Sequence, residues 1–113
     1  METRRDIFQA LADPTRREIL GLLSAEPQNL NALAAQFEMS RQAISLHVKI
    51  LRECGAISIQ QQGRERFCEL EPQKLAEVAE WLKPFRELWE SRFDQLDNVL
   101  LKLKNEEDEH NNL

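Results

Sequence analysis

The pattern of apolar and polar positions divides the chain into a helical first half, a short β-rich segment and a helical second half. Apolar residues recur at the three- and four-residue spacing of an α-helix in four successive stretches. These stretches are residues 5–12, 14–24, 29–37 and 41–54. Two short strands are predicted over residues 56–70, and helical spacing then resumes. The pattern therefore predicts a mainly α fold with one small β-hairpin.

The third and fourth helical stretches are separated by a short turn at Glu38 and Met39. Asn29 and Ser40 each precede a helix, and both are residue types that cap helix N-termini. We expect Met39 to pack on Ile44 as a hydrophobic staple. Two short helices across a tight turn form the helix-turn-helix pattern, whose second helix reads the major groove of DNA. An ordinary helical hairpin within a protein core is the alternative interpretation.

The second of these helices has two different faces. Its apolar face carries Ile44, Val48 and Leu51 together with His47, which we interpret as a structural histidine bonded to nearby backbone. The opposite face carries side chains that can contact bases or phosphates. The candidate DNA-binding residues on this helix are Arg41, Gln42, Ser45, Leu46 and Lys49. For Leu46, contact with a thymine methyl group and simple tolerance of an exposed apolar residue are both open.

The predicted hairpin directly follows this helix, and Gly55 suits the left-handed C-cap between them. Gly63 and Arg64 form the turn of the hairpin. The tip is polar, and we expect Gln62, Arg64 and Arg66 to follow the DNA backbone or to reach the adjacent minor groove. A hairpin in this position is a wing. An exposed turn that merely requires glycine and charge is the alternative.

The net charge of -5 at first argues against a nucleic-acid partner, but the charge is unevenly distributed. Residues 39–68 contain five cations and two anions, whereas residues 69–113 contain six cations and twelve anions. A basic face on an acidic body is compatible with phosphate contact. The overall acidity predicts weak non-specific affinity, so we expect binding to require the avidity of a dimer.

Composition excludes several other classes of protein. No apolar run approaches the roughly 20 residues that a membrane span requires, and the N-terminus lacks an apolar signal core, so we expect a cytoplasmic protein. Glycine-rich phosphate loops are absent and no nucleophile lies beside a plausible base, which predicts no enzymatic activity and no cofactor. Cys54 and Cys68 are too few for a disulfide framework. We expect both at buried edges, with a thiol redox switch as the alternative.

The C-terminal half carries two apolar stripes at helical spacing, including Trp81 and Trp89. So wide an apolar surface requires a partner helix. Pro84 predicts a break or kink near Lys83. We expect a winged helix-turn-helix domain over residues 1–104, with dimerisation helices from about residue 72, and an acidic tail over residues 105–113.

Three segments of the chain resemble the corresponding segments of the ArsR family of winged helix-turn-helix repressors. These segments are ALADPTRREILGLL, MSRQAISLHVKILRECGAI and QQGRERFCEL. The tryptophan-containing segment EVAEWLKPFRELW is similar to that of the non-metal, SdpR-like autorepressor branch. The resemblance extends from Ile7 to Leu103. It implies a transcriptional repressor or autorepressor that binds double-stranded DNA.

The resemblance also implies a homodimer whose two recognition helices enter successive major grooves of a palindromic operator. The first and last helices would form the dimer interface. The interface residues expected on this basis are Ile7, Phe8, Leu11, Trp81, Phe85, Leu88, Trp89, Leu96 and Leu100. Glu38 stands where the family usually has glycine, which implies a strained or altered turn.

The residues give little support for a metal site. Soft-metal repressors of the family carry paired cysteines on the first helix of the helix-turn-helix, whereas this chain has NALAAQFEM there. Zinc normally requires three or four His, Cys or carboxylate ligands. Cys54, Cys68 and His47 form the one conceivable cluster, and each has an adequate structural interpretation. We therefore predict no metal.

Two other functions remain open. The chain could be a protein-interaction adaptor that uses the apolar surface of its C-terminal helices, or a repressor that senses a redox signal or a small molecule. A stable homodimer that buries the C-terminal stripe would leave little surface for an adaptor. Unreactive cysteines and ligand-independent DNA affinity would exclude a sensor. The effector, if there is one, is not identified by the sequence.

Overall fold

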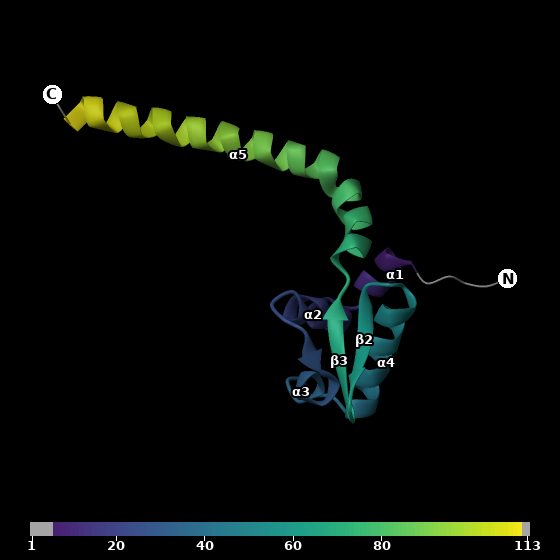
Figure 1. Cartoon of the computed structure of the whole chain (residues 1–113). Helices are drawn as coiled ribbons and strands as arrows, with labels where there is room; N and C mark the ends of the chain where they lie inside the picture. Colours follow the sequence, from purple (N-terminus) through teal and green to yellow (C-terminus); the bar gives the residue numbers. More distant parts are fainter. Residues whose placement is uncertain (1–5, 112–113) are drawn as a thin grey trace. The chain divides into compact units, whose positions relative to one another are not determined.

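The computed structural model describes residues 6–111, with side chains described through residue 109. It contains several helices and a small antiparallel sheet (Figure 1), which confirms the predicted mainly α fold with a hairpin. The elements in chain order are α1 (Ile7–Leu11), α2 (Pro14–Leu23), β1 (Gln28–Asn29), α3 (Leu30–Ala34), α4 (Arg41–Glu53), β2 (Ile57–Gln62), β3 (Glu65–Leu70), the 3₁₀ turn η1 (Pro72–Leu75) and α5 (Ala76–Asn111). The chain divides into two compact units between Val78 and Ala79, inside α5.

The first two helices begin at side-chain caps. The Asp6 carboxylate accepts a hydrogen bond of 2.8 Å from the Gln9 backbone N–H, and the Gln9 side chain accepts one in return from the Asp6 N–H. This reciprocal pair is a capping box. Asp13 caps α2 by accepting a 3.0 Å bond from the Arg16 N–H, and Pro14 occupies the first helical position. The predicted start of the second helix is therefore confirmed.

Helix α3 is shorter than the apolar spacing predicts. It ends at Ala34, whereas the spacing indicated a helix through Phe37. The N–H groups of Gln36 and Phe37 each bond to the carbonyl three residues earlier, at 3.1 and 3.2 Å. Such tighter turns commonly close a helix end. They bring Phe37 against the core without continuing α3.

The turn at Glu38 is altered rather than strained. Among residues 6–111, positive φ angles occur at Gly55 and Gly63 and at no other kind of residue. Glu38 therefore does not adopt the left-handed conformation that glycine would favour. Met39 is 39% exposed, and its Sδ accepts a hydrogen bond from the Thr15 hydroxyl of α2 at 3.8 Å.

The sheet contains one strand that the sequence pattern did not indicate. Strand β3 pairs antiparallel with β2 along its length, so Ile57 faces Leu70 and Gln62 faces Glu65. The two-residue strand β1 adds to the other edge of β3, giving the order β1-β3-β2. A strand of two residues is too short to show an alternating pattern in the sequence. It is a strand only because it pairs with β3.

The core of the first unit is formed by α1 to α4 and the inner face of the sheet. Helix α4 lies beside β2 in Figure 1 and contributes its predicted apolar face. Cys54 and Cys68 are buried in the same cluster, as predicted. The buried residues are Ile7, Ala10, Ile19, Leu20, Leu23, Leu30, Leu33, Ala34, Ile44, Val48, Leu51, Cys54, Ala56, Ile57 and Cys68.

Helix α5 continues through Pro84, so of the predicted break or kink near Lys83 the break is wrong. Proline removes one N–H donor from a helix, but the neighbouring hydrogen bonds keep this helix continuous. From Ala79 to Glu109, Leu82 is half-buried and the other side chains are exposed. Within the described residues, no helix is long and apolar enough to cross a lipid bilayer.

Candidate nucleic-acid interface

Helix α4 is fixed to the core by its apolar face and by its first turn. The Ser40 hydroxyl accepts a 3.1 Å hydrogen bond from the Ala43 N–H, as its predicted role as N-cap requires. Ile44, Val48 and Leu51 are at most 2% exposed. Gly55, with φ of 82°, ends the helix in the left-handed conformation that the sequence predicts. Both the position and the rotation of α4 are therefore set by the fold.

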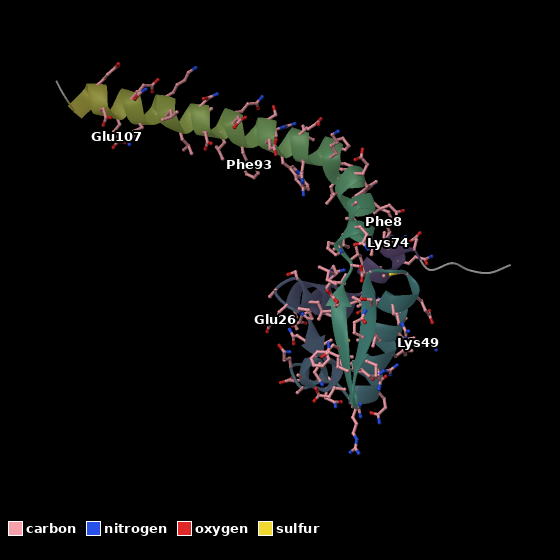
Figure 2. The ribbon with its side chains drawn as sticks, viewed as in Figure 1. Phe8, Glu26, Lys49, Lys74, Phe93 and Glu107 are labelled. Atoms are coloured by element: carbon pink, nitrogen blue, oxygen red, sulfur yellow. The ribbon has the colours of Figure 1, made fainter. Side chains whose placement is uncertain are left out.

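The opposite face of α4 carries polar side chains that the fold leaves unused. Arg41, Gln42 and Lys49 are exposed, and none of their side chains forms a hydrogen bond or ion pair with another residue in the range 6–109. Ser45 lies half-buried between them, and Leu46 is 58% exposed. Figure 2 shows the Lys49 side chain projecting outward from the helix. This face offers amide, hydroxyl and cationic groups that suit base edges and phosphates.

The β2–β3 hairpin follows α4 as a polar wing. Its turn contains Gly63, with φ of 64°, and the Gln61 side-chain amide donates a 3.3 Å hydrogen bond to the Gly63 carbonyl. The predicted wing residues Gln62, Arg64 and Arg66 are all exposed. Arginine on such a tip can bind the phosphate backbone or enter a narrow minor groove.

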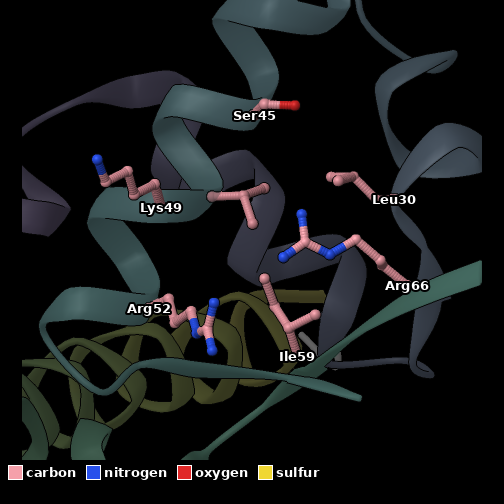
Figure 3. A pocket seen from close by; sticks show the side chains of 7 residues that line it. Leu30, Ser45, Lys49, Arg52, Ile59 and Arg66 are labelled. Carbon is pink, nitrogen blue, oxygen red and sulfur yellow. The ribbon is translucent and has the colours of Figure 1, made fainter. Parts of the chain in front are cut away.

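The surface between α4 and the wing is hollowed. One cavity of about 320 Å³ lies between α4, β2, β3 and the start of α3. A second, of about 270 Å³, lies at the first turns of α4 beside Arg41, Gln42 and Ser45. Figure 3 shows the Arg66 guanidinium pointing from β3 toward α4, into the first cavity.

Arg16, on α2, links this helix to α1 and α4. Its Nε donates to the Ala10 carbonyl at 2.7 Å, and its Nη2 donates to the Gln9 carbonyl at 3.2 Å. Its Nη1 lies 3.4 Å from Nδ1 of His47 on α4. Its bonds to these two carbonyls cap α1, because the last carbonyls of a helix lack partners within the helix.

His47 is a structural histidine, as predicted, but its partners are side chains rather than backbone. Its Nδ1 lies near Arg16 and 3.8 Å from the Asp13 carboxylate. The hydrogen bond from the Arg16 N–H chiefly holds the pKa of Asp13 below its usual value; burial opposes this, and the charges of His47 and Arg16 lower it further. The N-cap of α2 is thereby linked to the middle of α4.

The two cysteines have structural roles. The Cys54 thiol donates to the Leu51 carbonyl at 3.2 Å within the last turn of α4. Burial raises the pKa of the Cys68 thiol, against the opposing charge of Arg66. The thiolate is the reactive form, so this environment suppresses reactivity at Cys68. Among the described side chains, no three of the types His, Cys, Asp and Glu converge to hold a metal ion.

Most of the expected interface residues on the end helices are exposed. Large exposed apolar residues follow one another along α5, and Phe93 is 65% exposed (Figure 2). Trp81 and Phe85 contact each other, with ring centroids 5.1 Å apart. On α1, Phe8 is 41% exposed and Leu11 is half-buried. Ile7 belongs to the core, at 0% exposure, and therefore has no surface to offer a partner.

The sequence-predicted residues for DNA contact thus lie on two neighbouring elements of the first unit, α4 and the wing. Sequence reasoning did not single out Arg52, which lines the first cavity. Its spacing of three residues from Lys49 on α4 is the signal that could have found it. The capped helix after a tight turn, followed directly by a polar hairpin that exposes Arg64 and Arg66, defines this protein as a winged helix-turn-helix DNA-binding protein.

Comparison with known proteins identifies the family. A family model described as a helix-turn-helix domain matches residues 11–60. The chain is 32% identical over 80 residues to the transcriptional repressor SdpR of Bacillus subtilis, covering 71% of this chain and 89% of that protein. It is 45% identical to a crystal structure of an ArsR family transcriptional regulator, with a TM-score of 0.65 and coverage of 75% and 88% of the two chains.

A third similar protein is known from a solution structure. It is a homodimeric winged helix-turn-helix DNA-binding domain from Mycobacterium bovis, with a TM-score of 0.59 and 20% identity. The match covers 71% of this chain and 74% of that one, and at this identity it shows the shared fold. The chain belongs to the ArsR family, and it is a DNA-binding transcriptional regulator.

Proposed function

We propose that this protein is a transcriptional repressor that binds a palindromic operator as a homodimer. The observation that carries the proposal is the outer face of α4, where side-chain donors and acceptors without partners among the described residues stand next to a wing that exposes Arg64 and Arg66. In a two-fold dimer, the two α4 helices would enter successive major grooves about one helical turn apart.

The roles of the individual side chains follow from their chemistry. Gln42 can form paired hydrogen bonds with adenine, and Ser45 can bond to a base edge or a phosphate. Arg41 and Lys49 can bind guanine or phosphate, and Leu46 can contact a thymine methyl group. The wing residues Gln62, Arg64 and Arg66 would follow the backbone. Phosphate contacts position the protein, whereas base contacts specify the sequence.

Dimerisation is supported by the exposed apolar surface of α5. Leu88, Leu96 and Leu100 are each more than half exposed, and Trp89 is half exposed. A second copy of this helix would remove that surface from water at about 25 cal/mol per Å². The homodimeric assembly of the similar Mycobacterium bovis domain supports the same proposal. Because the chain carries an overall charge of -5, a single helix-turn-helix should bind DNA weakly, so tight binding requires the two copies in a dimer.

The decisive experiment is a binding titration against the upstream region of the chain's own gene. A scrambled duplex of the same length serves as the control, and both are titrated at several salt concentrations. We expect a preference of about a thousandfold or more for the upstream region. We also expect a log–log salt slope of several units, because several phosphates are neutralised. A promoter–reporter assay then gives the sign of regulation, which we expect to be repression.

Equal affinity for both duplexes would contradict the proposed operator. The exposed apolar surface of α5 would then favour the adaptor function, in which that surface binds another protein. A chain that is monomeric in solution, with α5 capturing a defined partner, would support the adaptor. A stable dimer with the specific duplex preference would exclude it.

A further inference from the structure

The cavity between α4 and the wing has features that sequence-specific DNA binding does not require. It has a volume of about 320 Å³ and lies at the junction of α3, α4, β2 and β3. Its floor is apolar: Leu30 and Val48 are nearly fully buried, and Ile59 is half-buried. Phosphate groups gain nothing from an apolar floor, because they are hydrated and fully charged.

Cations surround this apolar floor. Lys49, Arg52 and Arg66 line the cavity, and none of them is paired with a carboxylate among the residues that the structure describes. In Figure 3 the Arg66 guanidinium points into the cavity between Leu30 and Ile59, whereas the Lys49 amine points away. The Ser45 hydroxyl also faces the cavity. The two guanidinium groups can each bind a carboxylate with two parallel hydrogen bonds.

We propose that this cavity binds a small carboxylate with a compact apolar body, such as an aromatic or branched aliphatic acid. The carboxylate would pair with Arg52 and Arg66, and the apolar body would cover Val48 and Ile59. The volume lies at the lower end of the range for small-molecule sites, which is about 300–1,000 Å³.

The site also couples the ligand to regulation. This part of the inference rests on the proposed function, because Ser45, Lys49 and Arg66 belong to the proposed DNA face. A bound carboxylate would neutralise cationic charge there and occupy the space beside α4. DNA and the acid would therefore compete, and the acid would release the protein from its operator. By linkage, DNA would weaken binding of the acid by the same factor.

The test for the site uses the full chain without DNA, so it is independent of the operator. Amide chemical shifts are followed by NMR while benzoate is added at constant ionic strength, with acetate as a matched probe that lacks the ring. We expect saturable shifts for residues in the cavity, centred on Ser45, Ile59 and Arg66, and at least tenfold weaker binding of acetate. Inorganic phosphate should bind no better than acetate.

Two variants and a control locate the effect. Arg52→Gln removes one guanidinium at an exposed position outside the proposed DNA contacts, and we expect three- to tenfold weaker benzoate binding. Ile59→Trp fills the cavity and should abolish binding. Arg86→Gln, which removes an exposed arginine from α5, should leave binding unchanged. If Ile59→Trp does not fold, Arg52→Gln still decides the outcome.

Several results would overturn the inference. Shifts that do not saturate or that centre on Trp81 and Trp89 would place benzoate elsewhere. Equal binding of phosphate and benzoate at the cavity would show that it binds a phosphate group of the DNA backbone and is not a carboxylate site. The regulatory part is measured by fluorescence anisotropy with the operator duplex. Saturating benzoate should weaken operator binding at least tenfold, whereas acetate at the same ionic strength should not.

The outcomes separate the two proposals. Benzoate binding at the cavity, without any preference for the operator, would support the site and contradict the proposed repressor. Specific operator binding without benzoate binding would support the repressor and overturn the carboxylate site. Binding of both without competition would overturn the coupling between them.

Discussion

At the residue scale, Gln42 and Arg64 are proposed to perform different tasks on DNA. Gln42→Ala should reduce discrimination between the operator and single-base variants at one position by about 1–3 kcal/mol, because a base contact is lost. Arg64→Ala should weaken binding to all sequences alike and reduce the salt slope by about 1, because a phosphate contact is lost. Both are measured by anisotropy titration. Equal losses on every sequence for both variants would contradict the assigned roles.

Asp13 should make stability depend on pH. Its pKa in the folded chain lies below its ordinary value of 3.8, chiefly because the Arg16 N–H bonds to the carboxylate. This stabilisation is complete above the unfolded pKa and is lost as the pH falls through the folded pKa. Asn is also a good N-cap but carries no charge. Below about pH 5, wild type should therefore lose stability faster than Asp13→Asn.

The measurement for Asp13 is the free energy of unfolding in urea at a series of pH values. Partial exposure screens the charge, so the difference between the two proteins should stay within about 1 kcal/mol. Parallel curves for wild type and Asp13→Asn down to about pH 3 would show that the capping bond does not depend on charge.

At the element scale, the joint between α1, α2 and α4 depends on Arg16. Arg16→Gln should lower the free energy of unfolding by about 1.5–3 kcal/mol, because hydrogen bonds from a charged donor to two carbonyls are lost from a half-buried site. Arg17→Gln is the matched control. Arg17 is exposed and donates one hydrogen bond, to the Leu11 carbonyl at 2.7 Å. Its loss should cost about 0.5 kcal/mol, and similar losses for both would contradict the joint.

The passage from α4 to the wing depends on the conformation of Gly55. Gly55→Ala should cost about 1 kcal/mol, because L-residues disfavour positive φ. An added Cβ would meet the Lys74 side chain at an ordinary contact distance of 3.7 Å, so the cost arises from the backbone. Gly21→Ala is the control, since Gly21 lies inside α2 in open space. That change should stabilise by about 0.5–1 kcal/mol, and thermal melts measure both.

At the scale of the whole molecule, specific binding should depend on the apolar stripe of α5. Leu96 is 52% exposed, so Leu96→Glu should spare the core and disrupt the dimer. We expect a monomer by sedimentation and operator binding weaker by about a hundredfold, because two linked half-sites gain at least this much avidity. Asn98→Glu adds the same charge to the opposite face of α5 and should leave both properties unchanged. A Leu96→Glu protein that remains dimeric would contradict the proposed interface.

Charge distribution belongs to the same scale. Residues 39–68 carry a net charge of +3, whereas the whole chain carries -5. Non-specific attraction to DNA should therefore be weak, and specificity should come from contacts of α4 that are used twice in a dimer. The chain's acidity is concentrated in residues 69–113, which lie beyond the proposed DNA face in the sequence.

The sequence by itself determined the features that depend on local spacing. Helix starts at Asp13, Asn29 and Ser40 follow from side chains that reach an amide two or three residues away. The apolar face of α4, the left-handed Gly55 and the hairpin likewise depend on neighbours in the chain. Because the face of α4 is fixed by the burial of its apolar residues, the candidate DNA-contact residues could be assigned by periodicity.

The tertiary structure alone decided features that arise from contacts between distant residues. Strand β1 exists because residues 28–29 meet β3, about 40 positions later in the chain. Arg16 bonds to its carbonyl partners because α1 ends beside it in the fold. His47 lies near Asp13 because α4 packs on α2. Ile7 proved to be core rather than surface for the same reason. The cavity with Arg52 and Arg66 joins a helix to a strand, and such a juxtaposition leaves no periodic signal in the sequence.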